Sequence, residues 1–306
     1  MRIGLVGRKG GQLDSVHDNL SELLISFAEA IQNRGHTVVF ELETFNNVMT
    51  TKNSTFVAEN KQTSIFGTFE NITISSDICI VMGGDGTMLN AAKLLTSYNV
   101  SSIPILGINL GRVGFITDVP HDFDPNSIIE MLEKGNYKSE KRSLLRISNN
   151  GIGNTLALND IVISRSSGKI LEFNVSIDGL IAYKARGDGL IIATPTGSTA
   201  YAMSAGGSII HPTASVIEVI PIMPQTLSCR PIILNDTSYV DFELVNGEAQ
   251  IFADGNLIRN INSSEHLEIF KADRKVEFIH PNISNLTYNY FNTLSEKLNW
   301  HKSPGK

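Results

Sequence analysis

The sequence predicts an α/β N-terminal domain with a mainly parallel sheet, followed by an all-β-rich C-terminal domain. In residues 1–142, short apolar segments alternate with amphipathic helical ones, which is typical of parallel strands joined by helical crossovers. In residues 143–280, short strand patterns dominate and helical signal is sparse, which favours antiparallel strands. Residues 281–306 form a separate C-terminal segment. A chain of 306 residues is long enough to bury two cores.

The central strand of the first domain is expected at residues 77–82, where Asp-Ile-Cys-Ile-Val-Met contains an apolar run without alternation. Such a run is typical of a strand that is covered on both faces. Residues 44–70 are polar and poorly patterned, and we expect an irregular excursion there. The other expected elements are strands at 2–6, 37–42 and 103–108 and helices at 20–33, 88–98 and 127–134.

The second domain shows a helical pattern in only one short stretch, at residues 199–205. The last segment, residues 288–300, is helical in pattern and contains the single Trp, so we expect it to pack against another element. The expected strands are 144–148, 154–164, 170–177, 180–184, 189–193, 239–244, 249–252 and 275–279.

The net charge of −6 argues against nucleic-acid binding, because release of counterions from a phosphate backbone requires a basic face. A basic cluster is interleaved with Glu140 and apolar residues, and we interpret it as a solvated edge. The cluster consists of Lys138, Lys141, Arg142 and Arg146.

The two cysteines, Cys79 and Cys229, are too few for a disulfide framework and indicate a reducing compartment. No apolar run approaches the ~20 residues that a membrane span requires, and the N-terminus enters a strand without a signal-peptide pattern. We therefore expect a cytoplasmic protein without a membrane partner.

The stretch DICIVMGGDGTMLN, residues 77–90, is the most informative part of the chain. Gly83, Gly84 and Gly86 allow the backbone to turn sharply and approach a ligand after the central strand. Thr87 is expected to be the N-cap of the following helix, whose first N–H groups would point at an anion. Asp85 has the wrong charge for simply holding phosphate, which favours a catalytic or metal-binding role over an ordinary Asp-Gly turn.

Two weaker motifs follow. GINLGRVGFITD, residues 107–118, comes after a strand but lacks the G-x-G-x-x-G spacing, so it fails as a dinucleotide fingerprint. Residues 107–118 are equally compatible with a tight loop and with a ligand-binding loop. In a ligand-binding loop, Phe115 would line an adenine slot. ALND, residues 157–160, places Asn159 beside Asp160, a donor and an acceptor suited to a ribose diol. A bend in a long hairpin explains it equally well.

The segment RGDGLIIATPTGSTAYAMSAGG, residues 186–207, joins an apolar strand to a helix N-terminus rich in hydroxyl groups. Hydroxyls and free N–H groups there can satisfy a base edge or a phosphate, and Tyr201 adds an aromatic face. A linker of this composition would contain fewer aromatic residues, so a binding site is favoured.

Together, GGDGT at 83–87, NLGRVGFITD at 109–118, ALND at 157–160 and DGLIIATPTGSTAY at 188–201 closely resemble bacterial NAD kinases. The resemblance runs nearly end to end, as far as FNTLSEKLNW at 291–300. GGDGT alone is shared with lipid kinases and is similar to a loop of phosphofructokinases, so it indicates only phosphoryl transfer. TPTGSTAY is the specific segment. The resemblance implies that the C-terminal segment returns to the first domain.

The resemblance also implies an activity: transfer of the ATP γ-phosphate to the 2′-hydroxyl of the adenosine ribose of NAD, with a divalent cation, usually Mg²⁺. Asp85 would be the general base, and Arg186 falls where members that prefer NAD over NADH carry arginine. Asp188 would lie near the nicotinamide, across a subunit contact, because the family forms dimers and tetramers. Lys169 would contact phosphate on the donor side. Further NAD contacts are implied for Gly86, Phe115, Asn159, Asp160, Thr199, Ala200, Tyr201, Ala202, Met203, Ser204 and Asn256.

Two departures from the family pattern concern this pocket. Relatives often carry Glu at the position of Asp160 and Gln at the position of Asn256. Two alternative functions remain open at this stage. A lipid kinase of the same superfamily would need an apolar acyl-chain slot in the β-rich domain. A non-catalytic dinucleotide sensor would keep the pocket but would gain nothing from an acid in the phosphate loop.

Overall fold

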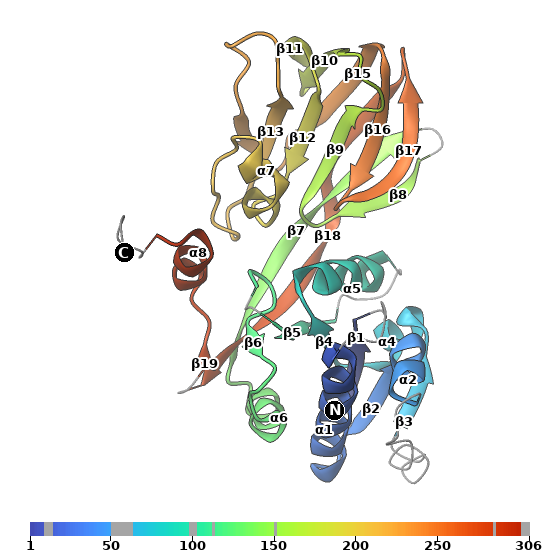
Figure 1. Cartoon of the computed structure of the whole chain (residues 1–306), viewed down its shortest axis with the longest axis vertical. Coiled ribbons are helices and arrows are strands. Elements are labelled where there is room, and N and C mark those ends of the chain that lie inside the picture. The colour runs from blue at the N-terminus through green and yellow to red at the C-terminus, as the bar shows by residue number, and fades with distance from the viewer. Residues whose placement is uncertain are drawn as a thin grey trace. The chain divides into compact units, whose positions relative to one another are not determined.

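The computed structural model describes residues 1–8, 15–49, 64–97, 103–111, 114–149, 152–283 and 286–300. The chain divides into two compact units, Met1–Glu140 with Val276–Lys306, and Lys141–Lys275. Strands β7 (Tyr137–Asn149) and β18 (His266–Ile283) each run from one unit into the other (Figure 1). The predicted fold class is confirmed, and the C-terminal segment belongs to the unit that contains the N-terminus.

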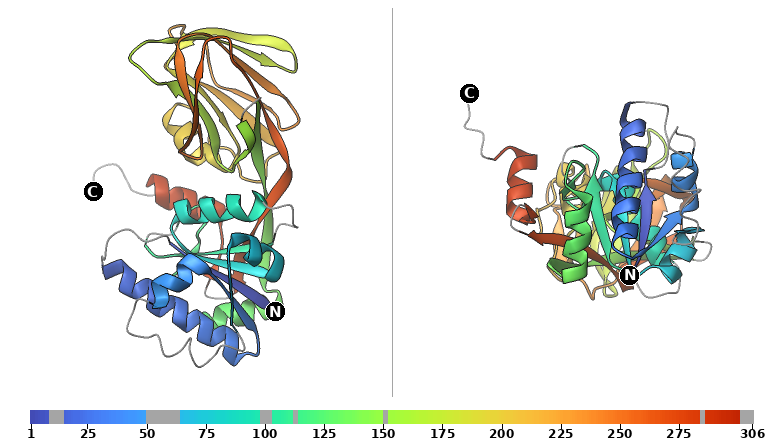
Figure 2. Two further views of the ribbon diagram at one scale, coloured as in Figure 1. Left: turned by 90° about the vertical axis from the view of Figure 1, so that its right-hand side faces the viewer. Right: turned by 90° about the horizontal axis from the view of Figure 1, so that it is seen from below.

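The first unit is built on parallel strands in the order β18-β5-β4-β1-β2-β3. Every residue of β4 (Ile78–Gly83) is buried, as its unbroken apolar run predicts. Figure 2 shows these strands between helix α5 (Asp85–Ser97) on one side and α1 (Ser15–Asn33) on the other. The remaining strands are β1 (Arg2–Gly7), β2 (Thr37–Glu41), β3 (Ser64–Gly67), β5 (Ile105–Asn109), β6 (Val119–Pro120) and β19 (Leu286–Thr287).

The core of this unit forms where α1 and α6 (Pro125–Lys134) pack on the sheet. Phe27 of α1 and Ile129 of α6 meet strand residues such as Ile80 in one apolar cluster. The C-terminal helix α8 (Tyr290–Leu298) begins at Asn289, whose side chain accepts from the N–H groups of the first turn. In the described part of the chain, the helices are all too short or too polar to cross a membrane.

The expectation of an irregular excursion at 44–70 is wrong for the residues that the structure describes. Helix α2 (Leu42–Met49), β3 and helix α4 (Phe69–Ser75) lie there, and residues 50–63 are outside the described ranges. The polar residues that obscured the pattern cap the helices. The Glu41 carboxylate accepts from the Thr44 N–H, and Thr68 forms a capping box with Asn71.

The second unit contains an antiparallel six-stranded sheet in the order β14-β13-β12-β9-β16-β17. A second group of strands pairs in the order β11-β10-β15-β18, and β7 pairs with β8. The core cluster contains side chains of both groups, including Phe173 stacked on Phe242, together with Ile192 and Ile251. The strands are β8 (Ile152–Ala157), β9 (Asp160–Arg165), β10 (Leu171–Ile177), β11 (Leu180–Gly187), β12 (Gly189–Ala193), β13 (Val216–Ile222), β14 (Ile232–Asn235), β15 (Val240–Asn246), β16 (Glu248–Ala253) and β17 (Asn256–Asn262).

Strands β13, β14 and β17 were not expected from the sequence, and the strand expected at 154–164 is two strands. The break falls at Leu158 and Asn159, because their N–H groups bind a side chain instead of a neighbouring strand. That break is where the ALND motif lies.

Candidate active site

The GGDGT loop joins β4 to α5, and its first glycine is required by close packing. A Cβ on Gly83 would lie 2.4 Å from the Thr87 hydroxyl oxygen. Helix α5 already begins at Asp85, and the N–H groups of Thr87 and Met88 both donate to the Gly84 carbonyl. The expectation that Thr87 caps the helix is therefore wrong, because Thr87 lies inside its first turn. A Cβ on Gly84 or on Gly86 would meet nothing within 4 Å, so this turn offers open space.

The Asp85 carboxylate binds the loop at residues 114–117. It accepts from the Phe115 N–H at 2.9 Å, the Ile116 N–H at 3.3 Å and the Thr117 hydroxyl at 2.8 Å. Gly114 makes room for it, since a Cβ there would lie 1.9 Å from Asp85 Oδ1. Two motifs that are separate in the sequence thus meet at one acid, which is oriented by three donors and remains partly exposed.

A pocket of about 240 Å³ adjoins this loop in the first unit. Its charged lining residues are Arg8 and Glu41. Both Glu41 carboxylate oxygens accept N–H bonds from the start of α2, and Oε2 also accepts from the Thr44 hydroxyl. The carboxylate charge is therefore largely satisfied within the protein. The full lining is Val6, Gly7, Arg8, Glu41, Phe69, Gly86, Thr87, Asn90 and Ala91.

In the second unit, Asp254 organises the ALND motif. Its carboxylate accepts from the backbone N–H groups of Leu158, Asn159 and Asp160 at 3.0, 2.7 and 3.2 Å. Asp254 and Gly255 form the two-residue turn between β16 and β17, with φ of 48° and 74°. Our sequence reasoning missed this role, although Asp-Gly between two strand patterns is a strong signal for such a turn.

The segment after β12 packs directly on this motif. The Thr194 N–H donates to the Asn159 carbonyl at 2.9 Å, and a Cβ on Gly197 would lie 2.1 Å from that carbonyl oxygen. Asn256 donates through Nδ2 to the Asp254 carbonyl at 3.2 Å. The structure therefore brings Asn159, Asp160, Asn256 and the start of the TPTGSTAY segment together. The rest of that segment forms a 3₁₀ turn (Gly197–Thr199) and helix α7 (Tyr201–Ser204).

One member of the basic cluster that we interpreted as a solvated edge supports this segment instead. Arg142 is 2% exposed, and its Nη1 donates to the Thr196 hydroxyl at 3.4 Å. Lys138 fits the original interpretation, since its side chain is 64% exposed. The sequence signal was ambiguous because Arg142 is flanked by Lys141 and Ser143, and the apolar Leu144 and Leu145 follow only on one side.

Three predicted site residues lie elsewhere in the second unit. Asp188 directly precedes β12 and pairs with Arg165 at 3.2 Å, whereas Thr194 directly follows β12. The five residues of β12 span about 17 Å at about 3.4 Å per residue. Arg186 is 60% exposed and pairs with Glu172, and Lys169 is exposed. The structure therefore does not bring these residues to Asn159 within one chain.

Two features together are typical of a two-domain kinase. One unit carries an oriented acid in a glycine loop at the carboxyl end of a parallel strand, and the other is an antiparallel β unit with its own polar cluster. Family profiles support this: residues 3–139 match the ATP-NAD kinase N-terminal domain and residues 158–281 match the ATP-NAD kinase C-terminal domain. The chain belongs to the NAD kinase family.

Curated relatives align along almost the whole chain. An NAD kinase of Thiobacillus denitrificans is 36% identical over 98% of this chain and 97% of its own length. One from Burkholderia pseudomallei is 37% identical over 99% of this chain and 94% of its own. The fold is also that of yeast NADH kinase complexed with NADH, with a TM-score of 0.83, 22% identity and coverage of 99% and 88%. An Archaeoglobus fulgidus NAD kinase in complex with ATP gives a TM-score of 0.70, 23% identity and coverage of 98% and 99%.

Proposed function

We propose that this chain transfers the γ-phosphate of ATP to the 2′-hydroxyl of the adenosine ribose of NAD, giving NADP in the cytoplasm, with Asp85 as the general base. The observation that carries the role of Asp85 is its geometry: a partly exposed carboxylate that three donors hold in one orientation. Phosphoryl transfer depends mainly on positioning and on charge neutralisation, so a fixed base suits it.

Asp85 would accept the proton of the ribose hydroxyl as the O–P bond forms. An aspartate with an ordinary pKa of ~3.9 is a weak base for an alcohol, so proton transfer must be late or concerted with phosphoryl transfer. Thr117 and the Phe115 N–H would keep the carboxylate aimed at the acceptor, and the Phe115 ring would lie on NAD beside it. Gly86, which has open space around its Cα, would allow close approach of the dinucleotide.

The donor phosphates would lie in the pocket beside the first turn of α5. Arg8 supplies positive charge there, and Gly83, Gly84, Gly86 and Thr87 form the loop around the helix N-terminus. Mg²⁺ is usually held by one or two carboxylates and the substrate phosphates, so it needs few protein ligands. The residues described here contain no group of three or more metal-binding side chains, which fits a cation that arrives with ATP. Bound there, it would neutralise phosphate charge.

The polar cluster of the second unit would hold the adenosine part of NAD. Asn159 and Asp160 would bind the dinucleotide, and Asn256 would add an amide contact. Asp254 would act indirectly, since it fixes the backbone of the ALND motif. The adenine and ribose contacts would come from Thr199, Ala200, Tyr201, Ala202, Met203 and Ser204.

Asp188 and Arg186 would serve the site of a second copy of the chain in a dimer or tetramer. Their separation from Asn159 along β12 supports this arrangement. Mixing two inactive variants, Asp85→Asn and Asp188→Ala, under conditions that allow subunit exchange should then restore part of the activity. No restoration, or a monomer by light scattering, would refute the shared site.

Activity with NADH should rise in Arg186→Gly if Arg186 selects NAD.

The decisive experiment measures NADP formation from NAD, ATP and Mg²⁺ together with direct NAD binding. Asp85→Asn should keep NAD affinity within a few fold and lose roughly 10²-fold or more in turnover, the usual scale for a general base. Asn also disturbs the loop, because its NH₂ group must face one of the donor N–H groups.

Thr117→Val is the matched control. It removes one hydrogen bond to Asp85 and one from the Asn109 side chain, and it leaves the carboxylate in place. If Asp85 only tethers the loop, Thr117→Val, which weakens that tether, should also lose a large part of the turnover. If Asp85 is the base, Thr117→Val should retain most of the turnover. Near-normal turnover in Asp85→Asn with lost NAD binding would refute the assignment.

A further inference from the structure

Glu218 is a fully buried acid in β13, at 0% exposure. Its neighbours Ile217 and Val219 belong to the main core of the second unit, whereas Ile220 packs with Ala202 of helix α7. Side chains alternate across a strand, so Glu218 lies on the same face as Ile220. The carboxyl group therefore lies on the α7 face of the sheet.

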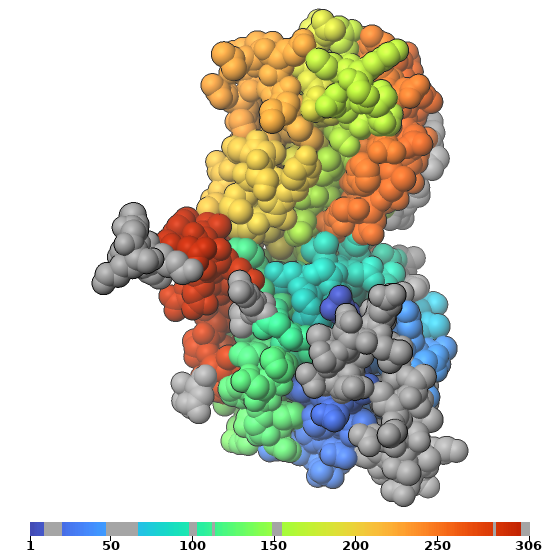
Figure 3. All heavy atoms as spheres, viewed as in Figure 1, coloured from blue at the N-terminus to red at the C-terminus, as the bar shows by residue number. Residues whose placement is uncertain are grey.

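The carboxyl group contacts the loop that follows α7. Oε1 accepts from the Ser208 N–H at 2.8 Å, while Oε2 has no hydrogen-bond partner among the described residues. A Cβ on Gly207 would lie 2.9 Å from Oε2, so the loop backbone passes close to this oxygen. The outer side of the segment is exposed, as the yellow surface in Figure 3 shows, and the Tyr201 side chain is 47% exposed. Glu218 thus supports the segment from its buried side.

The strands paired with β13 and helix α7 provide no cation for this carboxyl, and the one histidine of the loop after α7, His211, is exposed and contacts the Thr213 hydroxyl at 2.8 Å. Strands β12 and β14, which pair with β13, contain no titratable side chain, and neither do residues 205–210. Helix α7 contributes only Tyr201. Burial raises the pKa of Glu218, and the Ser208 N–H opposes this in part. The protonated form therefore persists to a higher pH than in an exposed glutamate.

We propose that Glu218 is a positioning residue for NAD: its neutral carboxyl holds α7 and the following loop in the binding conformation, and its ionisation releases them. The inference rests on the proposed function, which assigns residues 199–204 to the adenosine pocket. An ionised carboxylate with an unpartnered buried oxygen is costly, and water can reach it only if this segment moves away from the sheet. NAD binding would therefore weaken as the pH rises.

The test compares wild type with Glu218→Gln, Glu218→Leu and the exposed control Glu248→Gln, which makes the same Glu-to-Gln replacement on β16. NAD binding without ATP, and KM and kcat in the kinase assay, are measured from about pH 5 to about pH 9, the range in which a buried carboxyl titrates. Hydrogen exchange of the amides at 199–208 is measured at each pH.

We expect the Kd and KM for NAD to rise with pH in wild type and in Glu248→Gln, with little change in kcat, since Glu218 touches no reacting atom. Glu218→Gln, which cannot ionise, should keep the low-pH affinity and lose the rise. Glu218→Leu removes the acceptor of the Ser208 N–H and should bind NAD about tenfold more weakly at every pH.

An unchanged rise in Glu218→Gln, or wild-type affinity in a folded Glu218→Leu, would overturn the proposal. Failure of the proposed function is distinguishable, because wild type would then make no NADP. In that case, hydrogen exchange still tests whether Glu218 holds residues 199–208 in place. Protection of residues 199–208 must fall with pH in wild type relative to Glu218→Gln, and equal protection in the two proteins refutes the role of Glu218.

Discussion

Asp85 is held by a loop that lies thirty residues further along the chain, and this contact is possible only because residue 114 is glycine. Three donors at residues 115–117 bind the one carboxylate. Hydrogen bonds to a charged acceptor are the stronger kind, so the loop is stabilised by the same group that we propose as the base.

Gly114→Ala should therefore disrupt the site. Its Cβ would overlap Asp85 Oδ1 at 1.9 Å and Thr117 Oγ1 at 2.5 Å, so the loop or the acid must move. We expect at least a tenfold loss of kcat, since small displacements of catalytic groups have large effects. Gly168→Ala is the control, because a Cβ there meets nothing within 4 Å. Equal activity of the two variants would contradict the proposed role of the Asp85 geometry.

His280 is a second buried polar centre, in the first unit. Nδ1 lies 3.0 Å from Asp118 Oδ2, Nε2 lies 3.8 Å from Glu140 Oε2, and the ring stacks on Tyr288 at 3.9 Å. His280→Phe keeps an aromatic ring but removes the imidazole between two buried carboxylates. We expect a loss of about 3 kcal/mol in the free energy of unfolding, measured in urea. Tyr288→Phe, which preserves the stack and removes only a hydroxyl, should cost much less; a similar cost would contradict a leading role of the imidazole between the two carboxylates.

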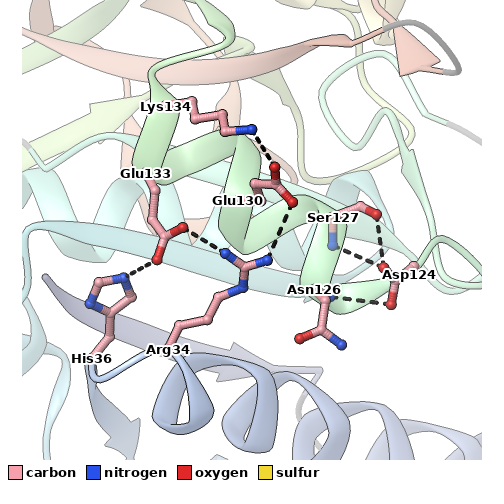
Figure 4. Close-up of polar contacts among 8 residues, drawn as sticks. All are labelled: Arg34, His36, Asp124, Asn126, Ser127, Glu130, Glu133 and Lys134. Atoms are coloured by element: carbon pink, nitrogen blue, oxygen red, sulfur yellow. Dashed lines mark hydrogen bonds and ion pairs between the residues drawn. The ribbon is translucent and has the colours of Figure 1, made fainter.

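Helix α6 illustrates how local sequence signals define an element. Asp124 caps it by accepting from the Asn126 and Ser127 N–H groups (Figure 4). Pro125 occupies its first turn, and Gly135 ends it with φ of 67°. Arg34, just after α1, pairs with Glu130 and Glu133 of α6. These ion pairs are partly exposed to solvent, which screens them, so each contributes little to stability. The cap is the stronger contribution.

Asp124→Ala should lower the free energy of unfolding by about 1 kcal/mol, the usual cost of losing an N-cap. Arg34→Ala should cost less, about 0.5 kcal/mol.

Hydrogen bonds, led by that from the Ser127 hydroxyl, lower the pKa of Asp124 below its unfolded value. Its contribution is therefore present above about pH 4 and is lost on acidification through the folded-state pKa. Urea midpoints of wild type and Asp124→Ala should converge at low pH; a constant difference would contradict the cap.

Elements with caps and glycine stops could be predicted to within a few residues, as α6 shows. The region around α2, β3 and α4 could not, because its capping residues Glu41, Thr68 and Asn71 are polar and obscured short apolar faces. Strands β13, β14 and β17 were missed for a related reason. Their stability depends on pairing with strands distant in the sequence, and such pairing leaves a weak local pattern.

Each of the two units contains one cysteine, so each can be followed separately. Cys79 is fully buried in β4, and burial raises its pKa; Cys229 is partly buried, and burial raises its pKa as well. Thiolates react and thiols do not, so both should react slowly with a thiol reagent in the native protein. Cys229 should react first, and Cys79 only when the first unit opens.

Labelling should be measured by mass spectrometry in increasing urea, with Cys79→Ser and Cys229→Ser as single-thiol controls. The Cys79 rate should follow opening of the parallel sheet, because β4 pairs on both sides with β1 and β5. Rapid labelling of Cys79 in the absence of denaturant would contradict a fully packed central strand.

The sequence by itself determined the two-part fold class, the loop with its single acid, and the family, because these depend on hydrophobic periodicity and on motifs that are contiguous in the chain. The tertiary structure alone decided which residues act together. Asp85 meets the loop after Gly114, Asp254 organises Asn159, Arg142 supports Thr196, and Glu218 lies beneath α7. These pairs are separated by 10 to about 100 residues, and close contact between such residues depends on strand register and on packing, neither of which leaves a local pattern.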